Sequence, residues 1–316
     1  MEEAVVVGGG TMGCDVAAGF HAAGWHVWIV EPDAGRRAGL PGRLDAASRA
    51  IGGDGSGRLS VCETLAQVQW RDTRIVVECA PEDLDIKRRV FAELERLAPA
   101  ATPLTSNSSS FPISQIGAGL QTRHRMVGLH YFMPAHLVPA VEVVRGEATD
   151  EAVAQEVSRI MRETGKRPVQ VKRDVPGFLA NRIQHAMMRE AIALVEEGFA
   201  SAEDVDAAVR YGFGFRYIAA GPLLQKDLAG IDIHCAAAAT MYPYLHTDAE
   251  PSRLMRDMVK RGDIGVKSAT RKGFYRWTDE TIAAQQQRYQ TALAKAMQIL
   301  KDEEADPVAA PPPAGA

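Results

Sequence analysis

Two ionisable residues, His130 and Glu142, stand in stretches of the sequence that are otherwise apolar. Burying a lone carboxylate is costly, so Glu142 needs a charged or hydrogen-bonding partner. If the two stretches are strands that pair, His130 is the obvious partner. A carboxylate on one ring nitrogen fixes the imidazole tautomer and leaves the other nitrogen free to take a proton from an alcohol. The pair therefore predicts a general base for alcohol oxidation.

A glycine-rich turn lies near the start of the chain. Gly8, Gly10 and Gly13 form a GxGxxG pattern between an apolar run at residues 4–7 and a helical pattern through residue 23. In a dinucleotide site these glycines allow a tight turn, close approach to a pyrophosphate and close helix packing, and the helix N-terminus favours the negative charge. A glycine turn that binds nothing is the alternative interpretation.

An acidic residue supports the dinucleotide interpretation. Glu31 ends the next β-rich run, 18 positions after Gly13, where a ribose 2′-hydroxyl is expected. A carboxylate there repels a 2′-phosphate, so NAD is preferred over NADP. Arg36 and Arg37 lie close by and would favour NADP, unless they belong to a solvated helical turn.

Polar groups follow three successive predicted strands. They are Glu82, the segment at residues 107–110, and His130. Each has an ordinary explanation, namely a helix-capping acid, a polar turn and a buried core histidine. Ligands of open parallel sheets bind at the carboxyl ends of strands. Together with the glycine turn, these groups predict one site at that edge.

The elements that position these residues alternate along the first half of the chain. Strand patterns occur at residues 4–7, 27–30, 75–79, 103–106, 126–130, 141–144 and 169–171, with helical patterns between several of them. This predicts an α/β fold with a Rossmann-type doubly wound parallel sheet. We expect two short helices around a glycine-rich turn at residues 52–57. After residue 176 only helical spacing remains, which predicts a second, all-helical C-terminal domain.

The expected boundaries are an NAD-binding Rossmann domain at 1–174, a helical substrate and dimerisation domain at 175–304, and a disordered Pro/Ala tail at 305–316. The length of 316 residues allows two domains.

Composition narrows the function class. Hydrophobic residues are 46% and charged residues 24%, as in soluble globular proteins. A net charge of −4 gives no general attraction to nucleic acid or anionic lipid, so a small-molecule substrate is expected. Four scattered cysteines without CxxC spacing predict neither a disulfide nor a metal site. An acidic start without an export leader, and the lack of a long apolar run, predict a cytoplasmic protein without membrane attachment.

These motifs together resemble the 3-hydroxyacyl-CoA dehydrogenase family, including its L-gulonate 3-dehydrogenase and lambda-crystallin branch. The match runs from the glycine turn to the Lys-Gly-Phe-Tyr segment at residues 272–275. Its other motifs are the serine-rich turn at 106–110, the histidine and glutamate 12 residues apart, and the Val-Pro-Gly-Phe-Leu-Ala-Asn-Arg segment at 175–182. The resemblance implies reversible, NAD-dependent oxidation of the 3-hydroxyl of an L-3-hydroxyacyl compound, a place in fatty acid metabolism, and a homodimer formed through the helical domain.

The resemblance also implies roles for particular residues. The catalytic group comprises His130, Glu142, Ser109, which bridges cofactor and substrate, and Asn181, which reaches the substrate from the helical domain. The cofactor-binding group comprises Gly8, Gly10, Thr11, Met12, Gly13, Glu31, Glu82, Lys87 and Asn107, with Glu82 and Lys87 on the nicotinamide side.

The sequence departs from the family pattern at three places. Met133 replaces the asparagine of the family's His-x-x-Asn-Pro motif, and the turn after Lys267 is two residues longer than usual. Residues 38–70, which offer lysines to CoA in the CoA-using branch, contain three arginines and no lysine. A CoA thioester and a free hydroxy acid therefore both remain open as substrates.

Two other functions are considered. The lysine-dependent β-hydroxyacid dehydrogenases place a lysine on the first interdomain helix, and residues 177–197 contain none. A crystallin-like NADH-binding protein without turnover is the other alternative. The intact His130 and Glu142 argue against it, whereas Met133 leaves it open.

Overall fold

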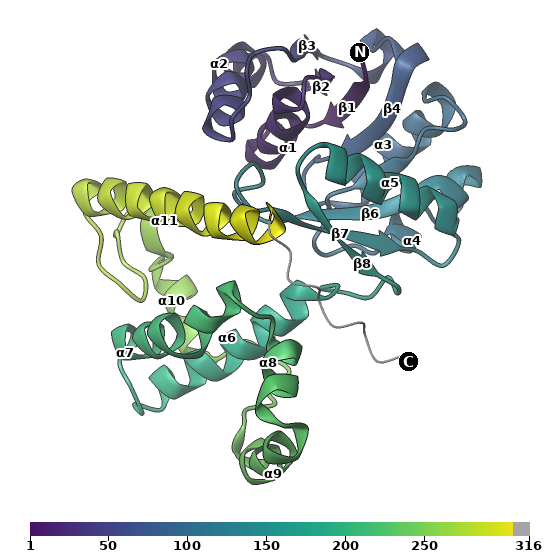
Figure 1. Ribbon diagram of the computed structural model, residues 1–316. Coiled ribbons are helices and arrows are strands. Elements are labelled where there is room, and N and C mark those ends of the chain that lie inside the picture. Colours follow the sequence, from purple (N-terminus) through teal and green to yellow (C-terminus); the bar gives the residue numbers. More distant parts are fainter. Residues whose placement is uncertain (306–316) are drawn as a thin grey trace. The chain divides into compact units, whose positions relative to one another are not determined.

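The computed structural model describes residues 1–305 (Figure 1). Contacts divide the chain into two compact units, Met1–Arg182 and Ile183–Ala316. The expected domain boundary at 174/175 stays a prediction. The expected disordered tail lies outside the described residues, except for Ala305, which ends the last helix.

The first unit is built on one eight-stranded sheet in the order β3-β2-β1-β4-β5-β6-β7-β8. Its strands are β1 (Glu3–Val7), β2 (His26–Val30), β3 (Arg58–Cys62), β4 (Thr73–Glu78), β5 (Leu104–Ser106), β6 (Met126–Tyr131), β7 (Ala140–Arg145) and β8 (Arg167–Val171). The order reverses direction at β1, as in doubly wound folds. The predicted Rossmann-type fold is confirmed.

The sheet is mostly, rather than wholly, parallel, because β7 runs antiparallel to β6. Residues 132–139 between them are too few for the crossover that a parallel pair requires. The reversal brings the start of β7 to the edge where β6 ends. It also places His130 directly opposite Glu142 in the strand register.

Helices cover both faces of this sheet (Figure 1). One buried cluster joins the sheet to α1 (Thr11–Ala22), α2 (Ala34–Ala50) and α5 (Glu151–Glu163). The other joins the opposite face to α3 (Leu84–Leu97) and α4 (Ile113–Ile116). Because side chains alternate along a strand, β1, β2, β3, β4 and β6 each contribute to both clusters.

The region after β2 differs from expectation. Instead of two short helices, α2 is one helix with Pro41 inside it, and the glycine-rich segment leads into the edge strand β3. Leu40, Leu44 and Ser48 form a buried stripe at spacing four, which holds the helix against the sheet despite the proline. Pro41 itself is exposed.

The second unit is helical in the part that the structure describes. Its helices are α6 (Ala180–Glu196), which begins in the first unit, α7 (Ala202–Ala207), α8 (Pro222–Ala229), α9 (Ile231–Met241), α10 (Arg253–Arg261) and α11 (Asp279–Ala305). The predicted helical C-terminal domain is confirmed. No helix within residues 1–305 is long and apolar enough to cross a membrane.

Candidate active site

Five neighbouring strands bring polar or glycine residues to one edge of the sheet. In spatial order these are Gly8 after β1, Glu78 on β4, Ser106 on β5, His130 on β6 and Glu142 on β7. The two-residue period places the last four on the face that α3 and α4 cover. A polar constellation is therefore built where α/β folds bind ligands.

His130 and Glu142 are in contact. The Nδ1 atom of His130 lies 2.8 Å from Oε2 of Glu142, and both residues are buried. This contact follows from their positions opposite each other on adjacent antiparallel strands, where side chains on the same face are neighbours.

The second oxygen of Glu142 accepts hydrogen bonds from the backbone at the start of α6. Its Oε1 accepts the backbone N–H groups of Leu179 at 3.0 Å and Ala180 at 2.8 Å. Burial raises the pKa of Glu142, but the bonds from His130, Ala180 and Leu179 outweigh it and hold the pKa below its ordinary value. An ionised carboxylate only accepts hydrogen bonds, so we infer that Nδ1 of His130 carries a proton. In the neutral ring, Nε2 then has the free lone pair.

The Nε2 side of His130 faces the serine turn. The Ser109 hydroxyl lies 2.9 Å from Nε2. The aromatic rings of Phe132 and Phe178 pack on the imidazole at centroid distances of 4.9 and 5.4 Å. Hydrogen bonds at both nitrogens and these two contacts hold the ring in one orientation.

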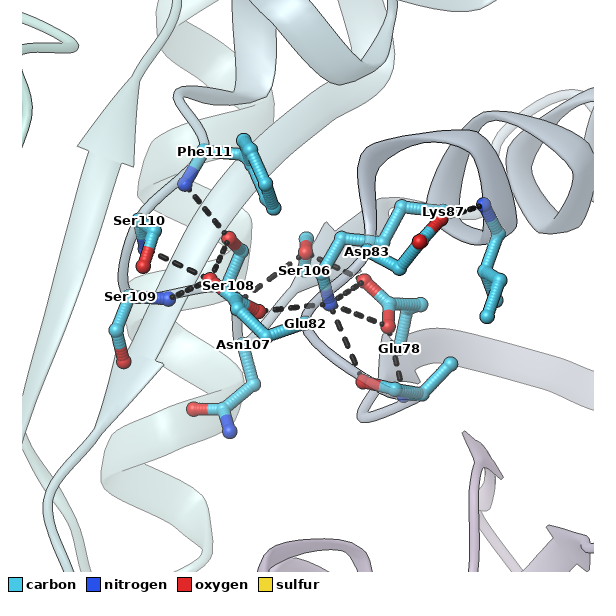
Figure 2. Close-up of polar contacts among 12 residues, drawn as sticks. Glu78, Glu82, Asp83, Lys87, Ser106, Asn107, Ser108, Ser109, Ser110 and Phe111 are labelled. Atoms are coloured by element: carbon cyan, nitrogen blue, oxygen red, sulfur yellow. Dashed lines mark hydrogen bonds and ion pairs between the residues drawn. The ribbon is translucent and has the colours of Figure 1, made fainter. Parts of the chain in front are cut away.

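Glu82 holds the serine turn in place (Figure 2). Its Oε1 accepts the Ser108 hydroxyl at 2.7 Å and the backbone N–H groups of Ser109 and Ser110 at 3.1 and 2.8 Å. Burial raises the pKa of Glu82, but the bonds from Ser108 and Ser110 and the nearby Lys87 hold it below its ordinary value. The carboxylate therefore acts as an ionised acceptor for the turn that presents Ser109.

Lys87 lies to one side of this turn, with its ammonium beside Glu78 and Glu82 (Figure 2), and is 1% exposed. Its Nζ donates to both carboxylate oxygens of Glu78 and to the carbonyl of Ala80, and it lies 3.3 Å from Oε2 of Glu82. An ammonium has only three N–H groups, all of which these acceptors occupy. The cofactor contact expected of Lys87 stays a prediction.

Asn107 links two strands at the site. Its backbone N–H donates to the Glu78 carbonyl, and its Oδ1 accepts the N–H of Tyr131 at 2.9 Å. The side-chain NH₂ group remains available to a ligand.

The glycine turn fits a dinucleotide. A Cβ atom on Gly13 would lie 1.8 Å from the Gly8 carbonyl oxygen, so only glycine allows this packing. A Cβ atom on Gly10 would meet nothing within 4 Å, which leaves open space at the start of α1. This helix has no capping side chain and no acid in its first turn. Its first N–H groups can therefore bind an anion such as a pyrophosphate.

The two residues after Gly10 differ in their surroundings. Thr11 is exposed, whereas Met12 is half-buried and packs against the core. Of the two, only Thr11 presents a polar side chain at the helix start.

Glu31 ties the glycine turn to the end of β2. Its Oε2 accepts the N–H of Gly9 at 2.8 Å, and its Oε1 accepts that of Asp33 at 2.9 Å. Each oxygen keeps acceptor capacity that a ribose hydroxyl could use. The Arg37 guanidinium donates to the carbonyls of Glu31 and Pro32 and pairs with Glu63.

Other features of the site were not found from the sequence. Glu78 is completely buried and breaks an apolar run in the same way as Glu142, a signal that could have revealed it. Phe178 has a positive φ of 47°, a strained conformation that no local pattern indicates.

Two residues singled out from the sequence differ in exposure: Asn181 is half-buried beside Ala180, and Met133 is 65% exposed. The substrate contact of Asn181 stays a prediction.

The family model for the 3-hydroxyacyl-CoA dehydrogenase NAD binding domain matches residues 3–175, and that for the 3-hydroxyacyl-CoA dehydrogenase C-terminal domain matches residues 177–277.

Two curated relatives match most of the chain. The 5-formyl-3-hydroxy-2-methylpyridine 4-carboxylate 5-dehydrogenase of Mesorhizobium japonicum is 31% identical, over 95% of this chain and 98% of its own length. A probable 3-hydroxybutyryl-CoA dehydrogenase of Bacillus subtilis is 33% identical, over 89% and 99%.

Two solved structures have a similar fold. A 5-formyl-3-hydroxy-2-methylpyridine 4-carboxylic acid 5-dehydrogenase, described as an NAD⁺ dependent dismutase, has a TM-score of 0.88 at 29% identity, covering 95% of this chain and 99% of that one. The (S)-3-hydroxybutyryl-CoA dehydrogenase of Ralstonia eutropha has a TM-score of 0.69 at 26% identity, covering 88% and 100%.

Proposed function

The chain belongs to the 3-hydroxyacyl-CoA dehydrogenase family of NAD-dependent oxidoreductases, and on that premise we propose that it oxidises a carbon-bound hydroxyl with His130 as the general base. The observation that supports this proposal is the chain of contacts from Glu142 through His130 to Ser109. It leaves one imidazole nitrogen able to accept a proton at the edge of the sheet.

The proposed steps follow from these contacts. The Ser109 hydroxyl and Nε2 of His130 together bind the substrate hydroxyl. His130 takes the hydroxyl proton as the hydride leaves carbon, and the Glu142 carboxylate stabilises the imidazolium that forms. Asn181 is proposed to contact the developing carbonyl.

The cofactor would be held by the elements around the glycine turn. We propose that Gly10 and the N-terminus of α1 hold the pyrophosphate, and that Glu31 binds a ribose hydroxyl. Bound NAD⁺ supplies the hydride acceptor. Asn107 is expected to contact the nicotinamide side through its free NH₂ group.

A substrate without CoA is the form that the region after β2 favours. In the lysine-free segment at residues 38–70, Arg49 already pairs with Asp45 at 2.6 Å, and just before the segment Arg37 pairs with Glu63 at 3.3 Å. Pairing lowers the positive charge that this segment offers to the phosphates of CoA. We therefore propose a free hydroxy acid first and a CoA thioester second.

A second candidate reaction is the oxidation of an aldehyde. It is favoured by the similarity, over nearly the whole chain, to a dehydrogenase whose name specifies a formyl group on a pyridine carboxylate. His130 would take a proton from the water that adds to the aldehyde. The hydrate anion that results would lose a hydride from carbon and give the carboxylic acid, so that one proton goes to His130 and one hydride would go to the cofactor. The exposed Met133 offers an apolar contact to an aromatic ring.

One panel of assays separates these substrates. Formation or consumption of NADH is followed with L-gulonate and other 3-hydroxy acids, with aromatic aldehyde acids, and with acetoacetyl-CoA, each with NAD and NADP coenzymes. A kcat/KM at least about tenfold higher for a CoA-free compound supports the proposal, and the reverse order identifies a CoA thioester enzyme. Binding of NADH without turnover of any compound would instead favour the silent, crystallin-like function. Fatty acid metabolism and a cytoplasmic location stay predictions.

The role of His130 is tested by His130→Ala. Loss of a positioned general base is expected to lower kcat by about 10²- to 10⁴-fold. The Kd for NADH, measured by fluorescence, should stay near that of the wild type, since His130 does not belong to the glycine turn. His124, an exposed histidine remote from this edge, provides the control variant His124→Ala. A kcat for His130→Ala within tenfold of the wild type would refute the assignment.

A further inference from the structure

The strongest unexplained feature beside the site is the buried carboxylate of Glu78 (Figure 2). Its side chain is 0% exposed, yet it has a full set of donors. Oε1 accepts Lys87 Nζ at 2.9 Å and the N–H of Ala80 at 2.7 Å. Oε2 accepts Lys87 Nζ at 3.1 Å and the Ser106 hydroxyl at 2.6 Å. A ligand therefore cannot reach this carboxylate.

Two routes of hydrogen bonds and ion pairs connect the Glu78 carboxylate to the serine turn. The first passes through Ser106, whose hydroxyl oxygen accepts the backbone N–H of Ser108 at 3.2 Å. The second passes through Lys87, whose ammonium lies between Glu78 and Glu82. Both routes end on the turn that carries Ser109.

In the second route, Glu82 connects Lys87 to the serine turn. Its side chain is 40% exposed and could turn toward solvent, but the ammonium of Lys87 on one oxygen and three donors of the turn on the other restrain it. The N–H of Ser109 itself is one of these donors. The direction of the Ser109 hydroxyl toward His130 thus depends on where the Glu82 carboxylate is held.

We propose that the buried Glu78–Lys87 ion pair is a positioning device that orients the Ser109 hydroxyl toward His130 through Glu82 and Ser106. The inference rests on the proposed function, because it assigns Ser109 to the reaction. Glu78 and Lys87 are positioning residues in this account, since their polar atoms are occupied within the protein. A buried ion pair often adds little net stability, so retaining one beside the site is consistent with a positional role.

The test uses the double variant Glu78→Gln/Lys87→Met, Ser109→Ala, and the triple variant that combines them. Removing both charges avoids leaving a single buried charge, which could prevent folding. We expect the double variant, assayed at saturating NAD, to lose about 10- to 100-fold in kcat, because small displacements of reacting groups are costly. Adding the same two changes to Ser109→Ala should change kcat by less than about twofold, since the hydroxyl to be oriented is absent.

A residue suitable for a matched control lies on α3, the helix that also carries Lys87. Glu95 of α3 accepts the backbone N–H and the hydroxyl of Thr122, both at 2.9 Å, so it holds a turn in the same way but away from His130. Glu95→Gln should leave kcat unchanged. Urea unfolding of each variant shows whether a loss of kcat merely follows a loss of folded protein.

The outcomes separate the two proposals. A wild-type kcat in Ser109→Ala rejects the proposed role of Ser109, and with it the premise of this inference. An impaired Ser109→Ala with a wild-type kcat in the folded double variant rejects the positioning role alone. An equal loss of kcat from the two charge changes with or without the Ser109 hydroxyl would overturn the inference in favour of a general structural role.

Discussion

At the scale of single residues, Glu142 decides the chemistry available to His130. Its two oxygens have different hydrogen-bond partners: one accepts from the imidazole, and the other accepts from the N–H groups of Leu179 and Ala180. A carboxylate can serve both sides because it only accepts hydrogen bonds. An amide has one accepting and one donating end, and cannot.

Glu142→Gln is therefore expected to disable the base. If the amide oxygen stays on Leu179 and Ala180, the NH₂ group faces Nδ1 and forces the imidazole proton onto Nε2. We expect kcat to fall by about 10²- to 10⁴-fold, the range for loss of a general base, with the Kd for NADH unchanged. Steady-state kinetics and NADH fluorescence measure the two effects. A kcat near that of the wild type would contradict the orienting role.

The same variant tests the lowered pKa of Glu142 through stability. Because its pKa in the folded protein lies below the ordinary value of 4.5, ionisation of Glu142 favours folding. This contribution is fully present above pH 4.5 and is lost as the pH falls through the folded-state pKa. In urea unfolding, the stability advantage of the wild type over Glu142→Gln should be largest near neutral pH and shrink on acidification below pH 4.5. An advantage that grew in acid would contradict the assigned direction.

At the scale of elements, the glycines of the turn between β1 and α1 have two different roles. One is required for close packing, and another leaves space for the proposed cofactor. Gly13 is required because a side chain would collide with the Gly8 carbonyl, whereas the space beside Gly10 is open. The start of α1 lacks a capping side chain, so its first N–H groups suit an external anion.

Gly10→Ala should fold normally and bind NADH poorly. Its backbone φ of −64° suits alanine, so we expect the free energy of unfolding to change by less than about 1 kcal/mol. The added methyl group occupies the proposed pyrophosphate position, which should raise the Kd for NADH by about tenfold or more, equivalent to about 1.4 kcal/mol. Gly13→Ala provides the contrast and should lose about 3 kcal/mol or more of stability through overpacking. Unchanged NADH affinity in folded Gly10→Ala would place the pyrophosphate elsewhere.

At the scale of the whole molecule, the second unit has much exposed apolar surface. On α8, Leu223 and Leu228 are 81% and 77% exposed, and on the adjoining α9, Ile231 and Ile233 are 59% and 64% exposed. Soluble monomers seldom leave so many large apolar side chains exposed on neighbouring helices, and exposed apolar surface of this kind marks interaction sites. We propose that a second copy of the chain covers this surface, as the family resemblance implies.

Leu228→Asp tests the dimer. Full burial of a leucine is worth about 1.5 to 3 kcal/mol, so replacing it with a charge should weaken the dimer by about 10- to 100-fold or more. Light scattering after size exclusion should report a dimer for the wild type and a concentration-dependent shift to monomer for the variant. Arg89→Asp on α3 introduces the same residue at an exposed polar position and should remain dimeric. A monomeric wild type would refute the proposed assembly.

The sequence alone determined the features that depend on local pattern. The glycine turn, the strands that contain His130 and Glu142, and the change to helical spacing after residue 176 were all evident from residue type and period. The family followed from several such motifs in order. These signals are local because strand alternation, helix spacing and glycine conformations involve neighbouring residues.

The tertiary structure decided what depends on contacts between distant segments. Only the antiparallel pairing of β6 and β7 places His130 opposite Glu142, and only the packing of α3 on the sheet buries Lys87 against Glu78. The edge strand β3 and the strained Phe178 likewise lack a local signal. Burial and charge pairing are set by which element covers a strand, and that choice is made by the whole hydrophobic core rather than by any one stretch of sequence.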